Sequence, residues 1–398
     1  MVDMTRDHSS RTNPGFRRGR RISDLMTHDY HAFLDSSFAA ERAGDAATAL
    51  EYHRGIPMFQ RSGHVVLLRQ LADLADEMTP WMWARWAAYQ CTRSEDRGSE
   101  GAAITHVALD YTLKMFCVDE IEATYLDGGD PVKIAARTAG EHWAFHQICS
   151  YELQGLECFL DTTATGRLAE SASLARGWVD ARIGGYRVES SAPEPLVVRG
   201  LAEDRSIQLL DLGGQVHADD AGWLLGRLVP SGTTPALMFD TRPLPVDERT
   251  ARAASTGDRR GAWITALVEA MSSGRVDPAV VWSEDRELVT DVPSLALVTR
   301  ATPKGALAST LDQLARGRDE VGRAAYRILR DVAAGSFGGN GDAPYVGAAA
   351  VNAHGYAEAR GGLVLGEHGA RWEHWADRVP DPARGRLLRL AELSRAAA

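Results

Sequence analysis

The spacing of apolar positions changes along the chain from helical to extended and back to helical. Over residues 23–183 apolar residues recur every three or four positions, which is typical of amphipathic helices. Residues 184–246 instead hold short apolar or β-branched runs that are separated by turn residues. Helical spacing returns after Arg252 and is most regular over residues 311–332. The pattern predicts an α+β fold, predominantly α, with helical N-terminal and C-terminal regions around a small antiparallel β-barrel or twisted sheet.

Four apolar runs in the central block are the predicted strands, at residues 195–201, 206–212, 223–229 and 236–240. The four residues between the first two runs suit a hairpin connection. Pro230 closes the third run and Pro243 follows the fourth, and proline disfavours a continuing helix. Short strands of this kind need neighbouring elements to cover their apolar face.

Two short motifs in this block support the same interpretation. Asp211 and Leu212 end the second run, and residues 226–230 read Gly-Arg-Leu-Val-Pro. Residues 195–240 resemble the small β-barrel module of some bacterial helicase-associated and secretion-motif-containing proteins, in which a strand ending in an Asp-Leu turn precedes a Gly-Arg-Leu-Val-Pro strand. The resemblance implies a barrel and no established activity.

Residues 33–59 predict two helices joined by a turn at Gly44. The segment resembles one unit of a tetratricopeptide repeat, with Phe33 and Ala49 at matching positions and Ser36 and Ser37 where Leu-Gly is expected. No second copy follows at that family's period of about 34 residues. An antiparallel helical hairpin is therefore the structural expectation.

The composition shifts divide the chain into six predicted segments. They are a disordered basic arm at 1–25, a helical domain at 26–183, the barrel or sheet at 184–246, a mixed region of helices and one strand (294–299) at 247–334, a Gly-rich linker at 335–342, and C-terminal helices at 343–398.

Three tryptophans within six residues form the first candidate site. Trp81, Trp83 and Trp86 follow Pro80. Closely spaced indoles can form a surface that binds another protein, because large amphipathic rings dominate interface energetics. The same spacing is also typical of a helix that packs in the core.

The N-terminal arm is the second candidate site. Arg17, Arg18, Arg20 and Arg21 lie in a polar stretch that cannot bury enough apolar area to fold alone. Such a cluster can contact nucleic acid or an acidic partner. A solvated leader, or translation from Met26, is the alternative interpretation.

His142 and His146 form the third candidate site. On a continuous helix two residues four apart share a face, so both rings could bind one metal ion with Glu122 or Glu152 as a further ligand. Trp143 stands where metalloproteases of the usual kind carry a glutamate. Two hydrogen-bonded or partly exposed histidines, or a helix-turn-helix over residues 134–148 without basic residues on its second helix, are the alternatives.

Charge, cysteine spacing and motif content limit the kinds of function that the sequence predicts. The net charge of −10 disfavours broad adhesion to nucleic acid or anionic membranes. The four cysteines form no Cys-x-x-Cys pair, which favours reduced thiols in the cytoplasm. The chain has no apolar run of transmembrane length, and the sequence predicts no membrane association. It carries none of the phosphate-loop, dinucleotide-binding, kinase or Gly-x-Ser-x-Gly motifs, and predicts no cofactor.

Three functions follow from these observations. The first is a cytoplasmic, non-catalytic scaffold or adaptor that binds another protein through the Trp81–Trp86 cluster. The second is a regulator that contacts nucleic acid through the arginine-rich arm. The third is a metal-dependent enzyme centred on His142 and His146.

Overall fold

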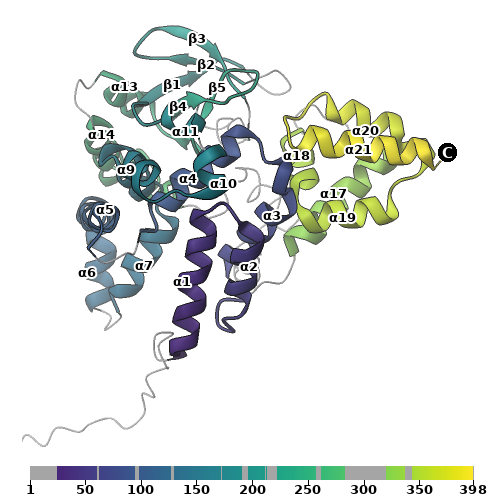
Figure 1. Ribbon diagram of the computed structural model, residues 1–398. Coiled ribbons are helices and arrows are strands. Elements are labelled where there is room, and N and C mark those ends of the chain that lie inside the picture. Colours follow the sequence, from purple (N-terminus) through teal and green to yellow (C-terminus); the bar gives the residue numbers. More distant parts are fainter. Residues whose placement is uncertain are drawn as a thin grey trace, which may run out of the picture.

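Helices and one antiparallel sheet make up the part of the chain that the structure describes (Figure 1). The structure is a computed structural model, and it describes residues 25–60, 62–94, 98–126, 130–171, 173–190, 196–210, 212, 222–256, 261–282, 320–336 and 343–397. The predicted α+β fold class, predominantly α, is confirmed. None of the described helices is both long and apolar enough to cross a membrane.

The first helices begin where side chains can cap them. Thr27, Asp45 and Ser62 each accept a hydrogen bond from the backbone N–H three residues further on, and Pro80 is the first residue of α4. These elements are α1 (His28–Arg42), α2 (Ala46–Arg54), α3 (Gly63–Leu74), η2 (Ala75–Glu77) and α4 (Pro80–Cys91). The helical hairpin predicted over residues 33–59 is present as α1 and α2.

The helices that follow divide the helical pattern of residues 23–183 into short pieces. Two helices meet at Cys117, and the backbone is extended at His142 between two further helices. These elements are α5 (Glu100–Phe116), α6 (Val118–Leu126), α7 (Val132–Glu141), α8 (Trp143–Gln147), the π-helical η3 (Ile148–Glu152), α9 (Gly155–Thr162), α10 (Gly166–Ser171) and α11 (Ser173–Arg176).

The strands form one curled antiparallel sheet in the order β3-β2-β1-β4-β5, with β6 paired to β4. Their bounds are β1 (Ile183–Val188), β2 (Val197–Gly200), β3 (Arg205–Gln208), β4 (Trp223–Pro230), β5 (Leu237–Phe239) and β6 (Leu244–Pro245). Leu209, just after β3, bridges to Leu237 of β5. The two edges of the sheet therefore approach each other, as the predicted barrel-like curvature requires.

Strand β1 is the element that the pattern of apolar runs missed. It lies at the centre of the sheet and pairs with both β2 and β4, although it contains Gly184 and Gly185. A Cβ atom on Gly185 would collide with the backbone of Ala251 in helix α13. The glycine therefore permits a close approach between sheet and helix, and it also removes the apolar side chain that would have marked a strand.

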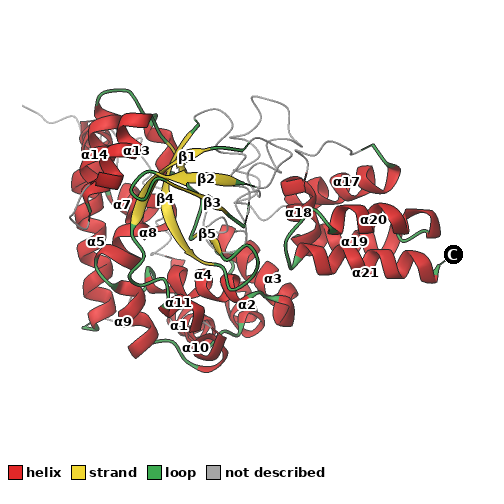
Figure 2. Cartoon of the chain, turned by 90° about the horizontal axis from the view of Figure 1, so that it is seen from above, coloured by secondary structure: helices red, strands yellow, loops and turns green. Residues whose placement is uncertain are grey.

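Helices precede and follow the strands in the sequence, and Figure 2 shows them in red around the yellow sheet. Those after the sheet are α13 (Glu248–Thr256), α14 (Ala262–Ser272), η4 (Pro278–Val281), α17 (Glu320–Ala334), α18 (Ala343–Val351), α19 (Ala353–Gly362), η7 (Gly366–His368), α20 (Gly369–Ala376) and α21 (Ala383–Ala396). In Figure 1 the helices α17–α21 lie together beside α3, away from the sheet.

The buried guanidinium of Arg386 joins this C-terminal group to the N-terminal helices. It binds Asp73 at 2.5 Å and Glu77 at 3.1 Å, and it donates to the carbonyl of Val351 at 3.1 Å. Because its side chain is 2% exposed, these contacts replace water around the charge. The two helical regions thus share a polar joint as well as an apolar core.

Several predicted features fall outside the described residues. These are the arm at 1–24, most of the Gly-rich linker (337–342), and the strand at 294–299.

Candidate functional site

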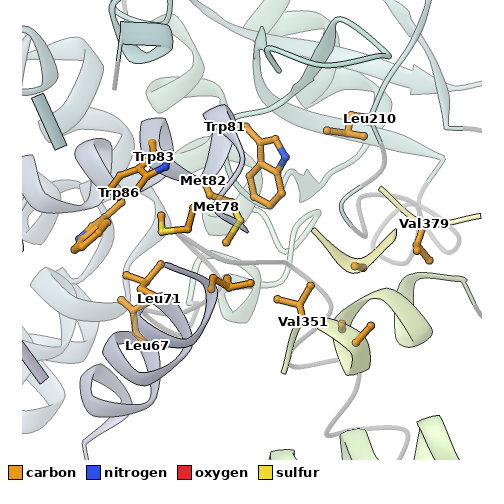
Figure 3. Close-up of a cluster of buried hydrophobic side chains, with 14 of the residues drawn as sticks. Leu67, Leu71, Met78, Trp81, Met82, Trp83, Trp86, Leu210, Val351 and Val379 are labelled. Atoms are coloured by element: carbon orange, nitrogen blue, oxygen red, sulfur yellow. The ribbon is translucent and has the colours of Figure 1, made fainter. Parts of the chain in front are cut away.

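The three predicted contact tryptophans lie in the core. Trp81, Trp83 and Trp86 are 2%, 5% and 1% exposed. The rings of Trp83 and Trp86 are stacked with their centroids 5.5 Å apart, and Figure 3 places them beside the leucines of α3. Their helix is covered on nearly every side, so the indoles do not form an exposed surface for a partner. The packing interpretation of the cluster is the one that agrees with the structure.

The two candidate metal-binding histidines are not on one continuous helix. His142 has an extended backbone conformation between α7 and α8, while His146 lies within α8. Their rings are 1% and 6% exposed, and burial lowers the pKa of His142 to about 3 and that of His146 to about 4. The ring of His142 packs edge-on against Trp282, with centroids 4.8 Å apart.

The predicted further ligands do not complete a metal site. Glu152 binds the guanidinium of Arg227 at 2.9 Å, and Glu122 is exposed on α6. Within the described parts of the chain, no group of three or more His, Cys, Asp or Glu side chains is placed to hold a metal ion. The helix break at His142 removes the shared face on which the metal prediction depended. It also makes α8 a buried helix of five residues, unlike an exposed DNA-reading helix.

The contacts of Arg17, Arg18, Arg20 and Arg21 lie outside the described residues.

A buried polar cluster that the sequence did not reveal surrounds Arg227 of β4. Its Nε donates to Gln147 Oε1 at 3.0 Å, its Nη2 contacts Glu152 Oε1 at 2.9 Å, and its guanidinium lies 4.0 Å from the centre of the Tyr151 ring. Gln147 in turn donates to Asp240 Oδ2 at 2.7 Å. Burial raises the pKa of Asp240, and Arg227 partly opposes that effect.

The Arg227 cluster connects the sheet to the helices that cover it. Arg85 of α4 donates to the carbonyl oxygens of Phe239 and Asp240 at 2.9 and 2.6 Å, so α4 is tied directly to the end of β5. Two cavities adjoin the cluster, with volumes of about 20 and 30 Å³. Each has room for roughly one or two water molecules, far below the several hundred Å³ of a typical ligand pocket. The cluster is therefore suited to joining elements and not to holding an organic substrate.

A second buried cluster lies around Glu41 of α1. Its carboxylate is 3.0 Å from His64 Nε2 and accepts from Gln90 Nε2 at 2.5 Å, while Arg93 lies 3.7 Å away. Burial by itself raises the pKa of Glu41, but His64 and Arg93 outweigh it and hold the pKa well below its usual range. Burial also lowers the pKa of nearby His53 to about 3. This cluster joins α1, α3 and α4.

A larger cavity of about 360 Å³ lies where the β4–β5 connection meets the α20–α21 connection. Thr233 and Thr234 line one side, and Asp377, Asp381 and Arg384 line the other. The cavity has the volume of a small-molecule site. Its lining includes no residue of the Arg227 or Glu41 cluster, so the buried titratable groups do not face it.

The most exposed apolar side chains belong to α5, α6 and the start of α7. Tyr125 and Leu126 of α6 are 74% and 84% exposed, Val132 of α7 is 68%, and Val107 of α5 is 55%. Half of the large apolar side chains that are exposed in the described structure lie between Val107 and Val132. Exposed apolar groups gathered on neighbouring helices are typical of interaction surfaces. We call Val107, Tyr111, Val118, Tyr125, Leu126 and Val132 the α5–α7 apolar set.

Helix α6 shows this exposure most clearly. It has nine residues, five of them apolar, and none of the nine is buried. An ion pair between Glu120 and Arg137, 3.4 Å apart and about half exposed, links this helix to α7. Short helices in proteins usually depend on burying an apolar face. Helix α6 leaves most of its apolar surface available instead.

The structure is that of an α+β protein with a curled antiparallel sheet. Buried polar clusters join the helices that pack on the sheet and on one another, and α5–α7 present exposed apolar side chains. No known protein family, no curated protein and no solved structure matches the chain. The resemblances of residues 33–59 and 195–240 to known modules therefore stay predictions.

Proposed function

We propose that this protein is a non-catalytic adaptor that binds another protein through the α5–α7 apolar set. The observation that carries the proposal is the exposure of Tyr125 and Leu126 on a helix with no buried residue. Removing such side chains from water stabilises a complex by about 25 cal/mol per Å² of apolar surface, before the costs of association.

The absence of cysteine cross-links supports a cytoplasmic location as part of this proposal. All four cysteines are free thiols, and three of them are buried. Reduced cysteines in a chain of this size are typical of reducing compartments.

The test compares capture of proteins from a lysate of the source organism by three forms of the tagged protein. They are the unmodified chain, the double variant Tyr125→Ser/Leu126→Ser, and a control, Leu365→Ser/Leu393→Ser. The control residues are 53% and 38% exposed and lie outside the α5–α7 apolar set. We expect one stoichiometric protein to be retained by the unmodified chain and the control, and to fall at least about tenfold with the double variant.

Two results would contradict the proposal. If the double variant retains every captured protein as well as the control does, the apolar set is not the contact. If the captured material is nucleic acid, elutes with a steep salt dependence and is lost on deletion of residues 1–25, the arginine-rich arm carries the function instead.

A further inference from the structure

The exposed face of α6 carries uncompensated negative charge between its apolar groups. Asp119 and Glu122 are both exposed and form no ion pair within the described structure. They lie one and four residues after Val118, and Tyr125 lies three residues after Glu122, so these side chains follow one side of the helix. The same helix side therefore combines apolar groups with two free carboxylates.

The surrounding helices reinforce this negative charge. The described residues 100–126 and 130–141 contain seven carboxylates, at positions 100, 110, 119, 120, 122, 130 and 141, and three cations, Lys114, Lys133 and Arg137. Lys114 is already paired with Asp110 at 2.6 Å, and Arg137 with Glu120 and Glu141 at 3.4 and 3.1 Å. These two cations therefore neutralise other carboxylates, and the described structure shows no ion pair of Lys133 with Asp119 or Glu122, so both of those carboxylates stay available.

We infer that the partner of the α5–α7 apolar set is a protein segment that forms an amphipathic helix with Lys or Arg beside its apolar face. Apolar residues of that helix would cover Val118, Tyr125 and Leu126, and its cations would meet Asp119 and Glu122. Charge complementarity of this kind selects the partner and speeds association more than it adds affinity. This inference rests on the proposed function, because it specifies what the same surface binds.

The test uses three fluorescent helical peptides of equal length and identical leucine spacing, with Lys, Gln or Glu at every polar position. Their binding to the full chain is measured by anisotropy at low and at physiological salt. We expect the Leu/Lys peptide to bind at least about tenfold more tightly than the Leu/Glu peptide at low salt, with a smaller ratio at higher salt.

Matched variants distinguish the effect of the α6 carboxylates on peptide binding from the effect of the net charge of the chain. Asp119→Asn/Glu122→Gln removes two carboxylates from α6, and Glu51→Gln/Glu392→Gln removes two exposed carboxylates elsewhere. We expect the α6 variant to weaken binding of the Leu/Lys peptide by about three- to tenfold and the remote variant to leave it nearly unchanged. Circular dichroism and urea unfolding verify that all variants are folded.

Each alternative outcome has a distinct meaning. If none of the peptides binds, or if the Lys and Glu peptides bind equally, the inference is overturned. It is also overturned if both charge variants weaken binding equally, because the attraction then comes from the net charge. If Tyr125→Ser/Leu126→Ser abolishes capture of the cellular partner while Asp119→Asn/Glu122→Gln leaves that capture unchanged, the adaptor function stands and the basic partner does not.

Sedimentation velocity of the chain alone tests whether a second copy of the chain binds the α5–α7 apolar set. A dimer that Tyr125→Ser/Leu126→Ser dissociates would assign this surface to a second copy of the chain and overturn the inference. A chain that stays monomeric at the peptide-binding concentrations agrees with a different, basic partner.

Discussion

Helices α4 and α6 are both short and rich in apolar residues, but the fold uses them in opposite ways. Ten of the twelve residues of α4 are buried, including its three tryptophans, whereas none of the nine residues of α6 is buried. Apolar content alone therefore does not separate a core helix from an interaction helix. What separates them is whether other elements of the same chain cover the apolar side chains.

The coverage of α4 comes from distant segments. Leu67 and Leu71 of α3 pack beside the tryptophans, and Arg85 reaches the end of β5, more than 150 residues away in the sequence. Helix α6 instead follows α5 directly and lies at the outer edge of the molecule in the view of Figure 1. We expect changes in α4 to alter stability, and changes in α6 to alter binding.

Replacing a tryptophan of α4 gives the largest expected effect and tests the comparison directly. Trp86→Ala should lower the free energy of unfolding by about 3–5 kcal/mol, because it removes a buried indole and leaves a cavity. Equilibrium unfolding in urea measures this change. A loss below about 1 kcal/mol would mean that the site is not tightly packed and would bring back the tryptophans as possible contact residues.

Breaking the Arg227 cluster is the next largest perturbation. Arg227→Ala should cost about 3 kcal/mol, because Glu152 and Gln147 lose their buried partner. Arg249→Ala is the matched control, since Arg249 pairs with Glu269 at 2.7 Å but is 72% exposed. The control should change stability by less than about 0.5–1 kcal/mol. Equal losses for the two variants would contradict the structural role of the buried cluster.

The burial of His142 predicts a loss of folding stability at acid pH, of intermediate size. The folded-state pKa of His142 is about 3, below its ordinary value of 6.5, so the unfolded chain binds the proton first as pH falls. Stability from this group is complete above pH 6.5 and declines as pH falls toward 3. Between pH 7.5 and pH 5 the loss should be about 2 kcal/mol.

His142→Gln provides the control for this pH dependence. Urea unfolding across the same pH range should show a shallower decline for the variant than for the unmodified chain, even if the variant is less stable overall. Parallel declines would mean that His142 is protonated similarly in both states, and its burial would then not control the acid response.

A change on α6 gives the smallest expected effect on stability. Tyr125→Ser should alter the free energy of unfolding by less than about 0.5 kcal/mol, because the ring is 74% exposed. The same urea measurement tests it. A loss above about 1.5 kcal/mol would show that the ring is packed, and would remove Tyr125 from the proposed interaction surface.

The sequence by itself determined the fold class and most element positions, because these depend on local spacing, capping residues and proline. The predicted runs near residues 206, 223 and 236 became β3, β4 and β5, and the expected hairpin became α1 and α2. Strand β1 escaped notice because its two glycines remove the side chains on which the pattern depends. The breaks at Cys117 and His142 lie within continuous helical patterns, and at His142 the extended backbone pairs with Trp282, 140 residues further along the chain.

Only the tertiary structure decided which residues are candidates for function. The clusters around Arg227 and Glu41 join side chains far apart in the chain, and Arg227 carries no local sign that it is buried. Hydrophobicity gives a side chain the tendency to leave water, but it does not specify which surface will cover it. For Trp86 that surface belongs to the same chain, while for Tyr125 and Leu126 the described chain leaves it open.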